Sequence, residues 1–359
     1  MKILLYTDVH WAETASIVRG RGQSFSLRLE NLIQSVNWAE QQARLQHCDA
    51  VMVLGDFFDK PNLTAEEITA LTKIEWSNLP HYFLVGNHDA NVSDLSFAST
   101  FVFQNPLFHI ISEPYMIEAG SSVTDQAAFI YLIPYIIEDN RQSLSAYIDS
   151  LTPSGNMAFT SRIVLSHNDL AGVRYGQFVS TQGFKVEEIL QQCDLFINGH
   201  LHNAGFVDES EHILNLGNLS GQNFTEDAYR YRHYCATLDT NNLQLEFFEN
   251  PHAFNFYRIE IGAEKDLKLF SNLKTNAVVS VQCTGALLSQ VKNLIEESNH
   301  IVASRVSLLL TASQEVSTIE ISQLAQTDYL KQFSDYVLSH VENTEAVQQE
   351  LQYVLVGGN

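Results

Sequence analysis

Side chains that commonly bind metals follow apolar runs at five places in the first 202 residues. In chain order, the blocks are D-x-H at Asp8 and His10, G-D-x-x-D at 55–59, G-N-H-D at 86–89, a single His167, and G-H-x-H at 199–202. Any one of these blocks is common in turns, but the whole series of carboxylate, amide and imidazole groups is hard to obtain by chance. Such groups are the usual protein ligands of divalent transition metals. The series therefore predicts a metal site.

The apolar runs before these blocks have the length and composition of buried strands. They are residues 2–7, 51–54, 81–85, 162–165 and 195–198. Helical patterns, with apolar residues spaced from Leu29 to Ala39 and again near 65–76, alternate with the first runs and indicate βαβ units. The carboxyl ends of parallel strands meet at one edge of a sheet, where α/β proteins bind ligands. We therefore expect the five blocks to converge there, with Asp56 as a metal ligand.

Length and composition bound the class of protein. The chain has 359 residues, of which 45% are hydrophobic and 17% charged. Single cores stop growing at roughly 250–300 residues, so we expect two or three units. No apolar run approaches the roughly 18 residues of a membrane span, and the first residues enter a strand without a leader, which predicts a cytoplasmic protein outside the membrane. Four scattered cysteines without a C-x-x-C pair indicate reduced, buried thiols.

The net charge of −22 opposes unaided binding to nucleic acid, because that affinity depends on Lys and Arg neutralising phosphates. Any phosphate chemistry must then be assisted by metal. Two basic clusters are candidate DNA contacts. They contain Arg19, Arg21 and Arg28, in a segment without acids that we expect to overhang the metals, and Arg230 and Arg232, interleaved with tyrosines over 229–234. Cations between aromatic rings suit phosphate contact and base stacking. An ordinary strand with one exposed basic face explains the second cluster equally well.

In their order and residue types, the five blocks resemble the calcineurin-like metallophosphoesterases over about residues 1–251. The resemblance implies an α/β (α+β) fold, a β-sandwich flanked by helices, with two divalent metal ions at the strand ends. It implies that Asp8, His10, Asp56 and His202 hold one ion, that Asp56, Asn87, His167 and His200 hold the other, and that Asp56 bridges the two. His88 is implied as a catalytic histidine that is not a ligand, with Asp89 orienting it.

The implied chemistry accounts for these residue types. Two divalent ions roughly 3.5–4 Å apart lower the pKa of a shared water and stabilise both oxygens of an in-line displacement at phosphorus. Mixed Asp, Asn and His ligands suit Mn²⁺, Fe or Zn²⁺ better than Mg²⁺, which prefers oxygen. Within this set the family resemblance favours Mn²⁺.

Further segments resemble the SbcD/Mre-type DNA repair nucleases of bacteria and phages. They are residues 55–59, 167–172, and 214–218 leading to 223–226. The resemblance implies a DNA exonuclease or endonuclease for end processing and recombination. It also implies a coiled-coil ABC-type ATPase (SbcC-like) as partner and a homodimer as an assembly. The sequence has no strand-linked G-x-x-x-x-G-K-[ST], so ATP hydrolysis must come from a partner.

The sequence predicts three parts. Residues 1–250 carry the metal blocks, and 251–318 form a small α/β capping domain with strands at 277–281 and 306–310 around a helix at 287–297. Residues 319–359 are predicted to be helical, with Leu330 and Phe333 on an apolar stripe that binds the partner.

Two other functions fit part of the pattern. One is a metallophosphoesterase acting on a small phosphodiester or phosphomonoester. This function is compatible with the acidic surface but assigns no role to the last hundred residues. The other is a non-catalytic scaffold subunit, which is disfavoured because no implied ligand position is missing.

Overall fold

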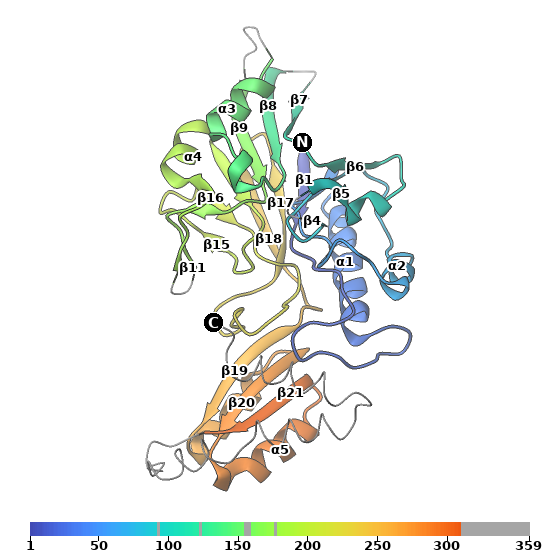
Figure 1. The fold of residues 1–359 in the computed structure, drawn as a ribbon, viewed down its shortest axis with the longest axis vertical. Helices are drawn as coiled ribbons and strands as arrows, with labels where there is room; N and C mark the ends of the chain where they lie inside the picture. The colour runs from blue at the N-terminus through green and yellow to red at the C-terminus, as the bar shows by residue number, and fades with distance from the viewer. Residues whose placement is uncertain (92–93, 122–123, 154–158, 176–177, 310–359) are drawn as a thin grey trace, which may run out of the picture. The chain divides into compact units, whose positions relative to one another are not determined.

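Two six-stranded sheets pack face to face in this computed structural model, which describes residues 1–91, 94–121, 124–153, 159–175 and 178–309 (Figure 1). The first sheet has the order β18-β17-β1-β2-β3-β6, from Gln244–Glu249, Tyr234–Asp239, Lys2–Tyr6, Ala50–Val53, His81–Leu84 and Phe108–Ile111. The second has the order β15-β16-β14-β9-β8-β7, from Gly205–Phe206, Ile213–Asn215, Leu195–Asn198, Phe159–Ser166, Thr124–Ile133 and Tyr115–Ser121. The predicted sandwich is thus confirmed.

The central core lies between the sheets. Ile3, Leu5 and Met52 of the first sheet pack in one cluster with Ile130 and Ile197 of the second. The helices α1 (Leu27–Leu45) and α2 (Ala65–Leu71) pack against the first sheet. The helices α3 (Leu144–Leu151) and α4 (Val186–Gln192) pack against the second. Strands β1, β2, β3 and β6 run parallel, as do β8, β9, β14 and β16. Each sheet therefore brings several carboxyl ends to one edge.

Helix α1 follows directly from its sequence. The Ser26 side chain accepts a hydrogen bond from the Leu29 backbone N–H, a common cap of a helix N-terminus. Leu29, Leu32 and Val36 recur at helical spacing and are fully buried. This apolar face packs in the cluster that also contains Val51 of β2, so α1 is the predicted crossover between β1 and β2.

A third, three-stranded parallel sheet follows the sandwich. It contains β19 (Asn255–Ile261), β20 (Ala277–Cys283) and β21 (Ile301–Leu308), and α5 (Leu288–Glu297) packs on one of its faces. The sheet belongs to the same compact unit as the sandwich, Met1–Leu308. The three-part division stays a prediction, and residues 319–359 lie outside the described residues. No helix among the described residues is long and apolar enough to cross a membrane.

Glu40 of α1 joins the helix to β3 by a buried polar network. Its carboxylate accepts hydrogen bonds from His81 Nε2 at 3.1 Å, the Ser77 N–H at 2.9 Å and the Tyr6 hydroxyl at 3.1 Å. Burial alone would raise the pKa of Glu40, but the His81 hydrogen bond and charge outweigh it, together with Ser77, and lower that pKa. The network therefore stabilises the ionised carboxylate.

We expect Glu40→Ala to lower the free energy of unfolding at pH 7 by about 3 kcal/mol, because removing one partner of a buried ion pair leaves the other unpaired. The folded pKa lies below the unfolded one, so this contribution is complete above the unfolded pKa and is lost as the pH falls through the folded pKa. Urea denaturation at pH 7 and about pH 3.5 measures both effects. Gln41→Ala, at an exposed position of the same helix, is the control. Equal stability of Glu40→Ala and the control at pH 7 would contradict the role of the network.

Candidate metal centre

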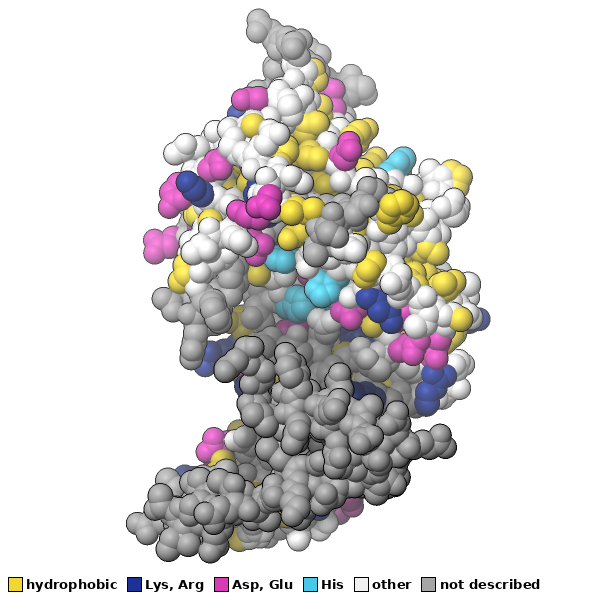
Figure 2. Space-filling view, viewed as in Figure 1, with side chains coloured by type: hydrophobic (Ala, Val, Ile, Leu, Met, Phe, Trp, Pro, Cys, Tyr) yellow, Lys and Arg dark blue, Asp and Glu magenta, His cyan; other side chains and the backbone are white. Residues whose placement is uncertain are grey.

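The seven side chains expected to bind metal all lie just beyond the carboxyl ends of five strands. Asp8 and His10 follow β1, Asp56 follows β2, Asn87 follows β3, His167 follows β9, and His200 and His202 follow β14. Histidine side chains gather near the middle of one face of the molecule (Figure 2). Both sheets of the sandwich thus contribute to one site.

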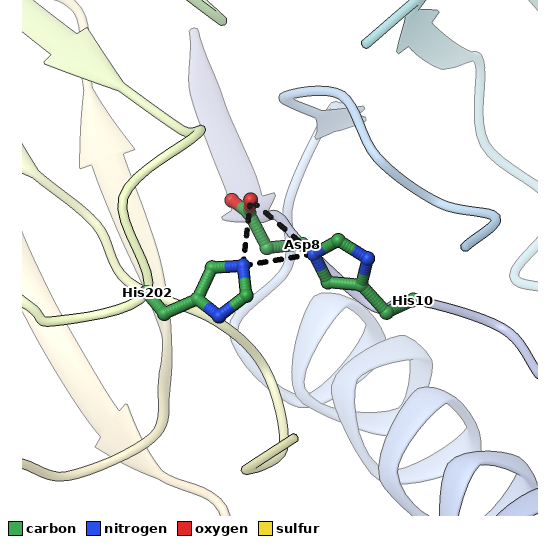
Figure 3. A group of neighbouring side chains, drawn as sticks. All are labelled: Asp8, His10 and His202. Carbon is green, nitrogen blue, oxygen red and sulfur yellow. Dashed lines mark hydrogen bonds and ion pairs between the residues drawn. The ribbon is translucent and has the colours of Figure 1, made fainter. Parts of the chain in front are cut away.

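Asp8, His10 and His202 form the first group (Figure 3). The Nε2 atoms of the two rings lie 2.9 Å apart, and Asp8 Oδ1 lies 3.8 Å from the first and 3.9 Å from the second. Asp8 Oδ1 is buried and has no hydrogen-bond partner among the described residues. Three electron-pair donors therefore face the same small space.

The outer nitrogens of these two rings determine which inner atoms carry lone pairs. His10 Nδ1 lies 3.0 Å from Asp59 Oδ1, and His202 Nδ1 lies 2.7 Å from Glu226 Oε1. An ionised carboxylate can only accept, so each Nδ1 donates, and a ring that has lost its other proton directs an Nε2 lone pair inward. Histidines that bind metal are usually held in this way by a carboxylate. The first group fits a divalent cation.

Asp56, His167 and His200 form the second group, together with Asn87. His167 Nδ1 donates to the Leu54 carbonyl at 2.6 Å, so the Nε2 atom, which faces Asp56 Oδ2 at 3.1 Å, is the one that can bind a cation once it loses its proton. His200 Nε2 meets Asp169 Oδ1 at 3.2 Å, which leaves His200 Nδ1 facing the Asn87 side-chain oxygen at 3.0 Å. With the rings deprotonated, acceptors again face acceptors, so this group also fits a cation.

Asp56 belongs to the second group and lies beside the first, in a further set with His10 and His88. Its Oδ2 lies 3.1 Å from His167 Nε2 and 3.9 Å from His10 Nε2, which come from different sheets. The site leaves no room for a side chain at Gly86, where a Cβ would lie 2.1 Å from Asp56 Oδ1. The arrangement fits two cations that share one carboxylate.

The histidine rings of the site can also bind protons, and their pKa values are shifted. Burial would lower the pKa of His167 and of His202, but the Asp56 and Glu226 carboxylates outweigh it and raise each pKa to about 9. Burial lowers the pKa of His10, and the neighbouring histidines lower that of Asp56 despite its burial. A cation that binds at these rings must displace their protons.

Residues 1–204 match the calcineurin-like phosphoesterase family. The chain belongs to this family. Its members typically bind two divalent metal ions, and the His/Asp groups of this calcineurin-like phosphoesterase are candidates for that role.

Among solved structures, the phosphoesterase is similar to the protein TT1561 of Thermus thermophilus, with 12% identity, 69% of this chain and 98% of that chain covered, and a TM-score of 0.40. It is also similar to a dimetal phosphatase from Danio rerio, with 15% identity, 66% and 91% coverage, and a TM-score of 0.38. No curated protein matches the chain.

Three carboxylates that hold the histidine rings were not among the predicted site residues. They are Asp59, Asp169 and Glu226. All three lie inside segments whose sequences resemble those of the SbcD/Mre-type nucleases, at 55–59, 167–172 and 223–226. The spacing does not indicate which ring each one meets, because these contacts join residues 49, 31 and 24 positions apart.

His88 and Asp89 occupy different environments. The His88 ring is partly exposed, lies 4.8 Å from the His10 ring, and its Nδ1 is 3.0 Å from the Asp59 carbonyl. Asp89 is fully buried and accepts hydrogen bonds from the Phe58 and Gly86 N–H groups, both at 2.8 Å. Burial and the nearby Asp56 charge raise the pKa of Asp89 to about 7. This differs from the expectation that Asp89 orients His88, because its carboxylate braces the backbone after β2 and β3.

Not all of the arginines predicted to contact DNA are free on the surface. Arg28 is fully buried and donates to Ser220 Oγ and the carbonyls of Gly221 and Val9, so it is a structural residue and not a surface contact. Burial lowers the pKa of Arg28 to about 10. The guanidinium of Arg21 is exposed but pairs with Glu66 at 2.6 Å.

The remaining arginines lie on the surface. Arg19 is exposed, and the Arg230 side chain is 78% exposed beside Asp227, at 3.7 Å. Arg232 donates to the carbonyls of Ala228 and Tyr231. Arg230 lies in a turn and Arg232 in an irregular segment, and both precede β17, so neither is in a strand.

The segment that carries Arg19 and Arg21 has a different neighbour from the one expected. Its Ile17 and Val18 pack with Phe256 and Val278 of the third sheet. The segment is therefore anchored at that sheet, and its predicted position over the metals gains no support from these contacts.

We expect Glu226→Gln to weaken divalent metal binding about 10- to 100-fold, because partners that hold metal-binding histidines typically have effects of this size. The neutral amide holds the His202 Nδ1–H less strongly than the carboxylate. Calorimetric titration of the chelator-treated protein with Mn²⁺ measures the change. Asp227→Asn removes a neighbouring, more exposed carboxylate as the control. Wild-type affinity in Glu226→Gln would contradict this role.

Proposed function

We propose that this calcineurin-like phosphoesterase is a Mn²⁺-dependent nuclease that hydrolyses DNA phosphodiester bonds as an SbcD-like subunit. The main support is the pair of donor groups with the Asp56 carboxylate beside both of them. Asp8, His10 and His202 would hold one ion with Asp56, and Asn87, His167 and His200 would hold the other. When bound, the two ions lower the pKa of a water and stabilise charge on the phosphate.

His88 is the candidate proton donor. Its backbone N–H donates to Asp56 Oδ1 at 2.8 Å, which keeps the residue at the centre, while its side chain is 44% exposed and can meet a substrate. The Asp59 carbonyl accepts from Nδ1 at 3.0 Å and so directs Nε2 away from the Asp59 backbone. A protonated ring in this place can stabilise negative charge and protonate the departing oxygen.

A DNA substrate is favoured by the segments that resemble the SbcD/Mre-type nucleases, and opposed by the net charge of −22. A partner that supplies positive surface would resolve the conflict. We propose that residues 319–359 bind a coiled-coil ABC-type ATPase for this purpose, since the chain has no nucleotide-binding motif of its own. A small phosphodiester is the second candidate substrate, because it needs no extended basic surface.

We expect chelation to abolish hydrolysis of linear duplex DNA and of bis-para-nitrophenyl phosphate, and Mn²⁺ to restore it better than Mg²⁺. Asp56→Ala should lose both metal and turnover, because its carboxylate lies 3.1 Å from His167 and 3.9 Å from His10 and so faces both groups. His88→Ala should keep its metal and lose roughly 10²–10⁴ in kcat, the usual effect of removing a general acid. Metal content by mass spectrometry and steady-state rates separate the two variants.

His300→Ala, which removes an exposed histidine before β21, is the control for that comparison. Full activity after chelation would refute the metal mechanism, and equal metal loss in both variants would refute the role of His88. Hydrolysis of the small diester without any cleavage of DNA would favour the second substrate.

We expect Leu330→Asp or Phe333→Asp, in the predicted apolar stripe, to abolish co-purification with the ATPase. A charge placed in an apolar interface must be desolvated without a counter-ion. Hydrolysis of the small diester should persist, because every proposed ligand lies at or before His202. Gln332→Asp adds the same charge off the stripe and is the control. Unchanged partner binding in both stripe variants would disprove the docking role.

A further inference from the structure

A pocket of about 940 Å³ borders the metal centre, with His200 and His202 in its wall. Phe206 of β15, Asn215 at the end of β16 and Tyr231 before β17 also line it. Its volume is in the range of pockets that bind small ligands. A group attached to a phosphate at the metal centre can therefore enter this pocket directly.

Two aromatic side chains give the pocket stacking surfaces. Phe206 lies on the edge strand β15 and is 40% exposed, so its ring is not needed to fill the core. Tyr231 is half-buried, and its hydroxyl has no hydrogen bond to another described residue. Exposed rings of this kind bind planar ligands by stacking, and base–aromatic stacking contributes substantially to nucleic-acid binding.

The charge of the pocket argues against a second phosphate. None of the described residues that line it is Lys or Arg, whereas Glu187 contributes an exposed carboxylate. Glu187 and the Tyr231 hydroxyl can accept hydrogen bonds from ring N–H and amino groups. The pocket thus combines apolar stacking surface with polar groups for the edge of a neutral planar ring.

We propose that this pocket binds the nucleobase of the nucleotide whose phosphate lies at the metal centre, with the base against Phe206 and Tyr231. The inference rests on the proposed nuclease function and specifies how the enzyme recognises its substrate. It also accounts for binding of a nucleic-acid unit beside an acidic protein surface, since stacking requires no positive charge. Tyr231 belongs to the aromatic and basic segment at 229–234, whose arginines lie outside the described pocket lining.

The test compares two esters that share the charge, the scissile bond and the leaving group. One is the para-nitrophenyl ester of thymidylate, and the other is its abasic analogue, in which hydrogen replaces the base. With Mn²⁺, the wild-type kcat/KM should be about tenfold higher for the thymidylate ester, the size of effect that one stacked base gives. Phe206→Ala should bring this ratio close to one, Tyr231→Ala should lower it, and Phe206→Trp should restore it.

Phe247→Ala is the matched control, because Phe247 is 39% exposed and lies on β18, the edge strand of the other large sheet. It should keep the wild-type ratio. A wild-type ratio of one would overturn the proposal, as would a ratio that persists in both Phe206→Ala and Tyr231→Ala.

Calorimetric titration of the Mn²⁺-loaded wild-type protein with thymidine monophosphate and with the abasic phosphate examines the pocket without turnover. About tenfold tighter binding of the nucleotide supports the proposal, and equal affinity overturns it. Failure to hydrolyse either ester would instead count against the proposed phosphodiesterase activity, so the two failures are distinguishable.

Discussion

The metal centre depends on electron pairs that the fold forces to face one another. His10 and His202 meet through Nε2 atoms 2.9 Å apart, while carboxylates hold their outer nitrogens. Such a cluster repels itself unless a proton or a metal ion lies within it. In the absence of metal the Glu226 carboxylate favours a proton, since it outweighs burial and raises the pKa of His202 to about 9, whereas burial lowers the pKa of His10. The backbone is constrained as well. Asp8, His10 and Asp56 all have positive φ angles, near 49°, which only a few per cent of non-glycine residues adopt.

The sandwich is what brings these groups together. The Leu54 carbonyl, just beyond β2 of the first sheet, accepts from the His167 ring, which follows β9 of the second and lies 113 residues away. Asp8, at the end of β1, likewise accepts from the His200 backbone N–H at 3.0 Å. Because the apolar core between the sheets fixes their relative position, a change in that packing would change the distances between the two groups.

The segment at 220–226 connects the metal centre to the third sheet. Gln222 donates to Asp59 at 2.6 Å and Glu226 holds His202, while Phe224 between them packs with Phe254 and Phe256. Arg28 strengthens this connection from α1, since its guanidinium holds Ser220 and Gly221 and lies 5.8 Å from the centre of the Phe254 ring. The third sheet is therefore in direct contact with the segment that orients the metal-site histidines.

Much of the fold could be predicted because its signals are local. Apolar runs of strand length, the helical spacing in α1 and the Gly-Asp step after β2 depend on neighbouring residues, and each appears where expected. Strand β19 (Asn255–Ile261) was not predicted, although its second half alternates buried apolar and exposed charged residues as strands typically do, just beyond the expected domain boundary. Its pairing with β20 is parallel and joins residues more than twenty positions apart.

The sequence by itself determined the metallophosphoesterase fold and the side chains available for metal, since both follow from short blocks at strand ends. Only the tertiary structure decided how these side chains are used. It pairs Glu226 with the His202 ring and Asp59 with the His10 ring. It also buries Arg28, which donates to backbone carbonyls, and Asp89, which accepts from the Phe58 N–H. The reason is physical: whether a charged side chain meets a ligand, a ring nitrogen or the backbone depends on packing between segments distant in the chain, which local residue patterns do not specify.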